Sequence, residues 1–260
     1  MKLAEGMARA RLTADAPGLT MAYYADLLHT DPPLERQSPE GGLTFDDLTG
    51  HQRELAALWL AAAGVPEPEE LQNIGLAPLR QMIGWLVEDR TGRIGQRLRE
   101  RTVRRLERLL VALLREVETY TTSSERRAQV RERVAGVIRR ERPRVVVAHS
   151  LGSVVAYETL HAHPELAVEQ LVTLGSPLGL PTLTRRLEPA VRGGRGARPP
   201  GVGHWTNIAD VGDLVAIPPK LSKVFPVDQD VSFDNGLDFH GFGAYLANGL
   251  TSLAIAPYVS

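Results

Sequence analysis

The spacing of hydrophobic positions along the chain changes near Pro143. Between residues 51 and 141, apolar residues recur every three or four positions, which is the spacing of an amphipathic helix with one buried face. The clearest stripe comprises Val103, Leu106, Leu110, Leu113, Leu114 and Val117. This spacing predicts that residues 51–141 are almost wholly helical.

Short, continuous apolar runs replace these stripes after Pro143. They contain many β-branched or aromatic side chains, as is typical of strands buried on both faces of a parallel sheet. A helical pattern follows the first run, and another opens at His240. The predicted strands are residues 145–148, 170–174 and 205–209, with an earlier one at Leu19–Tyr24. The alternation of strand and helix predicts an α/β fold with a mostly parallel sheet flanked by helices.

The length of 260 residues fits one large domain with a substantial core, so we assign residues 1–260 to a single domain. Within it, the helix-rich segment 51–141 is an insertion between the early strand and the strand that begins at Val145. Two roles are open for this segment. It is either a helical layer against the sheet or a cap over an active site.

Charge is distributed unevenly, although the net charge is only −1. The segment from Arg90 to Arg144 contains 17 arginines and seven glutamates. The interleaved glutamates favour helical i,i+4 pairing, and no aromatic residues alternate with the arginines, as a stacking surface for nucleic acid would require. We therefore interpret this segment as a charged helical surface and expect no nucleic-acid partner.

Composition excludes further classes of site. The chain has no cysteine, which excludes disulfides, thiolate metal sites and cysteine nucleophiles. No apolar run reaches the roughly 18 residues of a membrane span, and charged residues interrupt the segment MKLAEGMARARL, where a secretion signal would need an apolar stretch. We therefore expect a cytoplasmic protein without a transmembrane segment. There is no phosphate-loop or dinucleotide pattern, and His161 and His163 lack a suitably spaced third ligand, so we expect neither cofactor nor metal.

A serine lies between the first apolar run after Pro143 and the helical pattern that follows it, in the sequence RVVVAHSLGSVVAY. A nucleophile on such a strand–turn–helix elbow needs small residues two positions to either side, because the two backbones approach closely there. Ala148 and Gly152 occupy these positions around Ser150. The helix start also provides free N–H groups and the positive end of the helix dipole. The elbow predicts Ser150 as a nucleophile and the N–H of Leu151 as an oxyanion donor.

These residues resemble the α/β-hydrolase superfamily, in its bacterial lipase- and esterase-like branch with A/G-H-S-L-G-S elbows. The resemblance covers about residues 143–250, through VVVAHSLGSVVAYE, LVTLGSPLGL, WTNIADVGDLVAIP and HGFGAYL. It implies the α/β-hydrolase fold and a catalytic triad in the chain order serine, acid, histidine. The acid is then expected after a late strand and the histidine after the last strand.

Two aspartates compete for the position of the acid. Asp213 is preferred, because its surroundings, D-L-V-A-I-P, resemble the D-x-V-x-x-P stretch in which the family keeps its acid. Asp210 is the alternative, and it can instead cap the loop after the strand.

Seven histidines compete for the position of the base. Only His240 follows the acid at a family-like interval, on a loop that opens a glycine-flanked helix. His149 lies beside the nucleophile, where we expect its side chain to pack or hydrogen-bond locally. The others are interpreted as loop, surface or structural residues: His29, His51, His161, His163 and His204.

The resemblance implies acyl-transfer chemistry in which Ser150 attacks a carbonyl, His240 takes up and returns its proton, and Asp213 orients the imidazole. The predicted function is a serine hydrolase of carboxylic esters, lipid esters and thioesters included, with a small-molecule acyl ester as substrate. Two alternatives are open. One is an acyltransferase that uses the same triad, and the other is a catalytically impaired protein of this fold that serves as a binding module.

The family takes its second oxyanion donor from a loop after an early strand, usually marked by His-Gly. The only His-Gly pair in this chain is His240-Gly241, and the first 18 residues contain no apolar strand. We expect that the reading frame extended upstream of Met1 encodes such a strand. The alternatives are a donor supplied from elsewhere, for example Gly41-Gly42, and a degenerate hydrolase.

Overall fold

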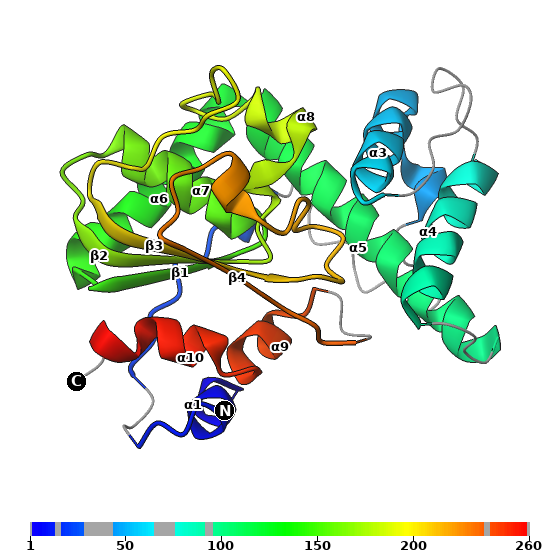
Figure 1. The fold of residues 1–260 in the computed structure, drawn as a ribbon. Coiled ribbons are helices and arrows are strands. Elements are labelled where there is room, and N and C mark those ends of the chain that lie inside the picture. Colours follow the sequence, from blue (N-terminus) through cyan, green and yellow to red (C-terminus); the bar gives the residue numbers. More distant parts are fainter. Residues whose placement is uncertain are drawn as a thin grey trace. The chain divides into compact units, whose positions relative to one another are not determined.

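The computed structural model describes residues 2–13, 17–28, 44–64, 76–91, 96–236 and 240–258 (Figure 1). The chain divides into two compact units. One consists of Met1–Tyr24 together with Glu125–Ser260, and the other consists of Ala25–Ser124. We call them the sheet unit and the helical unit, and each is described by itself.

The sheet unit contains, among the described residues, four parallel strands in the order β1-β2-β3-β4. These strands are β1 (Val145–His149), β2 (Val168–Leu174), β3 (Val202–Asp210) and β4 (Gln229–Phe233). Because all four run in the same direction, their carboxyl ends meet at one edge of the sheet. Residues that follow β1, β3 and β4 in the sequence therefore lie along this same carboxyl edge.

Helices cover both faces of the sheet (Figure 1). On one face lie α6 (Ser124–Glu141) and α7 (Leu151–Ala162), and on the other lie α1 (Lys2–Arg9), α9 (Phe242–Ala247) and α10 (Leu250–Ile255). The short helix α8, Pro181–Thr184, follows β2 in the chain. The core between the sheet and the second group of helices includes Leu3, Val172, Leu174, Ile208, Tyr245 and Ile255.

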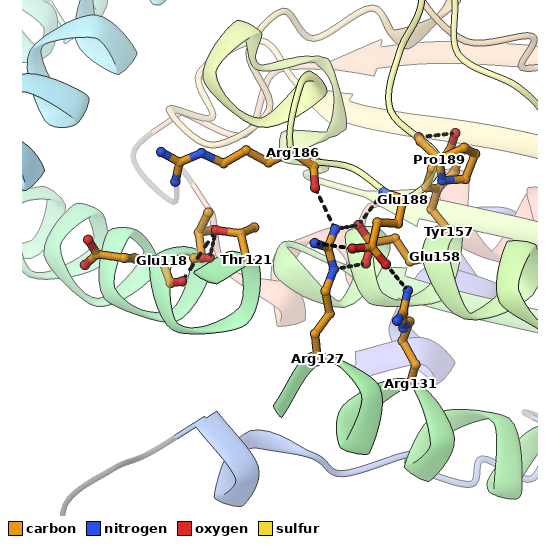
Figure 2. Close-up of polar contacts among 10 residues, drawn as sticks. Glu118, Thr121, Arg127, Arg131, Tyr157, Glu158, Arg186, Glu188 and Pro189 are labelled. Atoms are coloured by element: carbon orange, nitrogen blue, oxygen red, sulfur yellow. Dashed lines mark hydrogen bonds and ion pairs between the residues drawn. The ribbon is translucent and has the colours of Figure 1, made fainter. Parts of the chain in front are cut away.

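A buried charge cluster joins α6, α7 and the segment after α8 (Figure 2). Arg127 Nε donates to Glu158 Oε2 at 2.8 Å, and Arg127 Nη2 donates to Glu158 Oε1 and to the Arg186 carbonyl oxygen. The Glu188 N–H donates to Glu158 Oε1 at 3.0 Å, and the Glu188 carboxylate pairs with Arg127 and Arg131. The several hydrogen-bond and ion-pair partners of Arg127 and Glu158 offset the cost of burying these two charges. This Arg127–Glu158 cluster therefore connects the three segments.

The helical unit is built from α3 (Gly50–Ala62), α4 (Leu76–Thr91) and α5 (Gln96–Thr122), with the short helix α2 (Ala25–Leu28). The apolar stripe of α5 forms its buried face, as helical spacing requires. Buried members of this stripe are Leu106, Leu110, Leu113 and Leu114. None of the helices that the structure describes, in either unit, is long and apolar enough to cross a membrane.

The structure confirms the predicted α/β class with a parallel sheet flanked by helices. The described part of residues 51–141 is helical except at Ala63, Gly64 and Ser123. The predicted strand at Leu19–Tyr24 is wrong, because these residues form no strand, and the side chains of Leu19 and Met21 are 69% and 75% exposed. A strand needs a neighbour for its ladder hydrogen bonds, and an apolar run alone does not provide one.

Strand β4 is an element that apolar runs do not predict. Its sequence QDVSF contains only two strongly apolar residues, and the strand is only partly buried at the edge of the described sheet.

The division into units groups α6 with the sheet, although the sequence pattern predicts α6 as one of the helices of residues 51–141. Spacing identifies a helix but not its neighbours. The assignment of residues 1–260 to one domain stays a prediction.

Candidate active site

The backbone of Ser150 has a conformation that few residues other than glycine adopt. Its φ of 53° and ψ of −132° form the turn between the last residue of β1 and the first residue of α7. The Ser150 N–H donates to the Leu174 carbonyl at 3.0 Å, and the Ser150 carbonyl accepts from the N–H and Oγ of Ser153. Such strain persists only where surrounding bonds enforce it. The turn is a sharp strand–helix elbow with the serine at its tip.

Small side chains and a second serine support this elbow. Ala148 is buried at the end of β1, and a Cβ at Gly152 would lie 3.4 Å from the Tyr24 hydroxyl. Ser153 Oγ lies 2.7 Å from Ser176 Oγ, in the turn after β2. The elbow is therefore bonded to the neighbouring strand through Leu174 and to the next turn through Ser176.

Asp213 and His240 form a buried pair. His240 Nδ1 lies 2.7 Å from Asp213 Oδ2, and Asp213 Oδ1 accepts a hydrogen bond from the Val215 N–H at 2.8 Å. A carboxylate oxygen only accepts, so Nδ1 is the donor in this bond, and in the neutral imidazole Nε2 then carries the lone pair. Nε2 is buried and has no hydrogen-bond partner among the described residues. The imidazole is thus oriented at one nitrogen and available as a base at the other.

Ser150, Asp213 and His240 follow β1, β3 and β4, so all three belong to the carboxyl edge of the sheet. His149 links the elbow to the pair, because its ring centroid lies 4.5 Å from that of His240. No hydrogen bond joins Ser150 Oγ to His240 Nε2 in the structure. Catalytic hydrogen bonds often form only in the substrate complex, so this geometry is compatible with a serine–histidine pair.

His149 is a neutral neighbour of His240. Burial, and after it the nearby His240 ring, lower the pKa of His149 to about 3. Its ring also packs near those of Phe242 and Tyr245, at centroid distances of 5.3 and 5.5 Å. The expected local packing of His149 is therefore present, but sequence spacing does not predict that its partner is His240, 91 positions downstream.

Asp210, the alternative acid, has a different role in the structure. It is the last residue of β3, and its Oδ1 accepts a hydrogen bond from the Gly212 N–H at 2.7 Å. Burial raises the pKa of Asp210 to about 6, although hydrogen bonds from the backbone of Gly212 and Asn235 oppose this shift. Of the two aspartates, it is Asp213 whose carboxylate contacts His240.

The remaining predicted residues occupy several places. Leu151 is the first residue of α7, where a backbone N–H has no helical acceptor. His163 contacts Arg139, and His204 pairs with Asp228 at 3.2 Å. His161 packs against Tyr157, and His51 is an exposed residue of α3. His29, Gly41 and Gly42 lie outside the described residues.

Comparison of the chain with protein-family models, with curated proteins and with solved structures finds no match. The local geometry at the carboxyl edge of the sheet is therefore the basis for inferring a function.

Proposed function

We propose that the protein is a serine hydrolase of carboxylic esters, with Ser150 as nucleophile, His240 as general base and acid, and Asp213 as the residue that orients His240. The observation that carries this proposal is the buried Asp213–His240 pair, at the same carboxyl edge as the strained Ser150 elbow. A strained serine, a buried histidine with a free nitrogen and an aspartate on the other nitrogen are the elements of a catalytic triad. Their chain order also supports the α/β-hydrolase fold as part of the proposal.

The proposed reaction uses these three residues, the Leu151 N–H and water. Ser150 Oγ attacks the ester carbonyl while its proton passes to His240 Nε2, and the imidazolium is stabilised by Asp213. The tetrahedral oxyanion accepts a hydrogen bond from the Leu151 N–H. Its collapse breaks the bond to the alcohol, which takes the proton from Nε2 and leaves an acyl-serine. A water molecule then attacks the acyl group with the same base, which releases the acid and restores Ser150.

An apolar side chain near the pair favours substrates with an apolar part. Phe242, two residues after His240, is 41% exposed, and its ring centroid lies 5.3 Å from that of His149. Exposed apolar side chains beside a group of polar catalytic residues are typical of sites that bind apolar ligands. We therefore include lipid-like esters and thioesters in the substrate class.

A fluorophosphonate probe and p-nitrophenyl butyrate test this function. The wild-type protein should be labelled at Ser150 and should hydrolyse the ester, whereas Ser150→Ala should lose labelling and at least about 10⁴-fold of the hydrolysis rate. Ser222→Ala, at an exposed serine in the same unit, is the matched control and should retain both. Undiminished hydrolysis by Ser150→Ala would exclude the proposed nucleophile.

The same experiments separate the two alternatives. If the folded wild-type protein is neither labelled nor active, a non-catalytic binding module is favoured. An acyltransferase is favoured if the protein is labelled and, with ethanolamine or glycerol competing with water, transfers the acyl group mainly to the added nucleophile. Acyl transfer uses the same residues as hydrolysis and differs from it in the exclusion of water.

A further inference from the structure

The hydroxyl group of Tyr245, on α9, lies between Asp210, the last residue of β3, and Asp213, three residues later. It accepts a hydrogen bond from the Asp210 N–H at 3.0 Å and donates to Asp213 Oδ2 at 2.6 Å. A backbone N–H can only donate, so the single phenolic proton is directed to Asp213. The side chain is buried, at 1% exposure. No motif in the sequence marks this tyrosine.

The Asp213 carboxylate is held at three points. Oδ2 accepts hydrogen bonds from the Tyr245 hydroxyl and from His240 Nδ1, and Oδ1 accepts one from the Val215 N–H. Hydrogen bonds to an ionised acceptor are short and directional, so this arrangement fixes the plane of the carboxylate and the oxygen that faces His240. Without Tyr245, Val215 and His240 alone would orient it.

The position of Tyr245 is itself enforced by packing. Its ring meets that of Phe233, on β4, edge-on at a centroid distance of 5.3 Å, and its carbonyl accepts from Thr251 Oγ1 at 2.8 Å. Gly175, with φ of +53°, leaves the space that the hydroxyl and carboxylate need. A Cβ there would lie 2.7 Å from Asp213 Oδ2 and 3.0 Å from the Tyr245 hydroxyl. Burial and the Asp213 charge raise the pKa of Tyr245, so the hydroxyl stays protonated as a donor.

We propose that Tyr245 is a positioning residue of the proposed triad, which acts by holding Asp213 Oδ2 against His240 Nδ1. This inference rests on the proposed function. It adds a fourth side chain to the site. It also gives a physical reason why Asp213 rather than Asp210 contacts the histidine: the phenol accepts a hydrogen bond from the backbone of Asp210 and donates one to the carboxylate of Asp213.

The test is Tyr245→Phe, which removes one oxygen and keeps the ring. Hydrolysis of p-nitrophenyl butyrate should show a kcat lowered about tenfold with KM unchanged, because the lost bond orients a charged group and does not contact substrate. Tyr157→Phe is the matched control, since Tyr157 is equally buried and its hydroxyl is bonded to the Pro189 carbonyl. This variant should retain wild-type kcat.

A double-mutant cycle distinguishes positioning from a general structural effect. In the Asp213→Asn background, Tyr245→Phe should cause almost no further loss of kcat, because the carboxylate through which it acts is gone. An additive tenfold loss in that background would overturn the proposal. Wild-type kcat in the single variant would overturn it too, and so would a variant that fails to fold, because Tyr245 would then be a core residue only.

The two proposals fail in different ways. If wild-type protein is neither labelled by fluorophosphonate nor active, the proposed function fails, and the role of Tyr245 fails with it. If wild-type protein is active and depends on Ser150, a normal Tyr245→Phe variant overturns the positioning role alone. The His240 Nδ1–H proton resonance gives a readout without turnover: it should shift in Tyr245→Phe and stay unchanged in Tyr157→Phe.

Discussion

The sheet unit contains two buried groups of charged side chains that differ in how completely they are paired. In the Arg127–Glu158 cluster, both carboxylate oxygens of Glu158 accept hydrogen bonds, and Arg127 also bonds to the Arg186 carbonyl and to Glu188 (Figure 2). At the carboxyl edge, His240 Nε2 is buried without a hydrogen-bond partner among the described residues.

Under the proposed function, this difference separates a structural group from a reactive one. An unpaired buried polar atom costs about 1–3 kcal/mol, so folding alone favours complete pairing, as in the Arg127–Glu158 cluster. A general base needs a lone pair that the protein leaves open for the substrate. The two groups should therefore respond oppositely to substitution: one should lose stability, and the other should lose activity.

The largest expected effect is on activity at the carboxyl edge. Asp213→Asn should lower kcat by about 10⁴-fold, because the amide favours the wrong imidazole tautomer. Asp210→Asn is the matched control, three residues away, and should stay within about threefold of wild type. Steady-state hydrolysis of p-nitrophenyl butyrate measures both. The reverse order of the two variants would make Asp210 the acid.

The next effect is on stability at the Arg127–Glu158 cluster. Glu158→Gln leaves Arg127 without its buried counter-charge and should lower the free energy of unfolding by about 3 kcal/mol. Urea denaturation followed by circular dichroism measures this loss. The folded fraction should retain kcat, since Glu158 belongs to the other group. A stable variant with impaired kcat would contradict the division of roles.

A smaller effect depends on pH. Burial raises the pKa of Asp210 from 3.8 to about 6, so the folded protein holds this proton more tightly than the unfolded chain. The stabilising contribution of the protonated Asp210 carboxyl is present below about pH 4 and is lost as the pH rises through about 6. Asp210→Asn carries no charge, and relative to wild type it should gain about 2 kcal/mol of stability at pH 8 and almost none at pH 4. Urea denaturation at both pH values checks this, and an equal difference at both would refute it.

The smallest effect is expected at the rim of the Arg127–Glu158 cluster. Arg131 Nη1 pairs with Glu188 Oε2 at 2.6 Å, but the Glu188 side chain is 53% exposed. Solvent screens such a pair, so Arg131→Ala should cost only about 0.5 kcal/mol in urea denaturation. A loss as large as that of Glu158→Gln would show that the rim and the centre of the cluster act as one network.

Sequence patterns predict the local parts of this molecule well. The β-branched run before Ser150 and the small residues around it predict the strand, turn and helix of the elbow, and these are β1, Ser150 and α7. The stripe of leucines predicts α5 in the same way. These features follow from side chains within a few positions of one another, whose spacing matches the repeat of a helix or a strand.

Patterns fail where an element depends on a distant neighbour. The apolar run Leu19–Tyr24 has the composition of a strand but forms none, whereas the more polar Gln229–Phe233 pairs with β3 as β4. Composition describes how well side chains fit a sheet. It does not determine whether another strand is present to accept the backbone hydrogen bonds.

The sequence by itself therefore determined the α/β class, the elbow and the short set of candidates for acid and base. Only the tertiary structure decided that Asp213 rather than Asp210 contacts His240, that His149 packs on the same ring, and that Tyr245 bonds to Asp213. The physical reason is distance along the chain. These contacts join residues 27 to 91 positions apart, and they depend on the order and register of the parallel strands rather than on any local repeat.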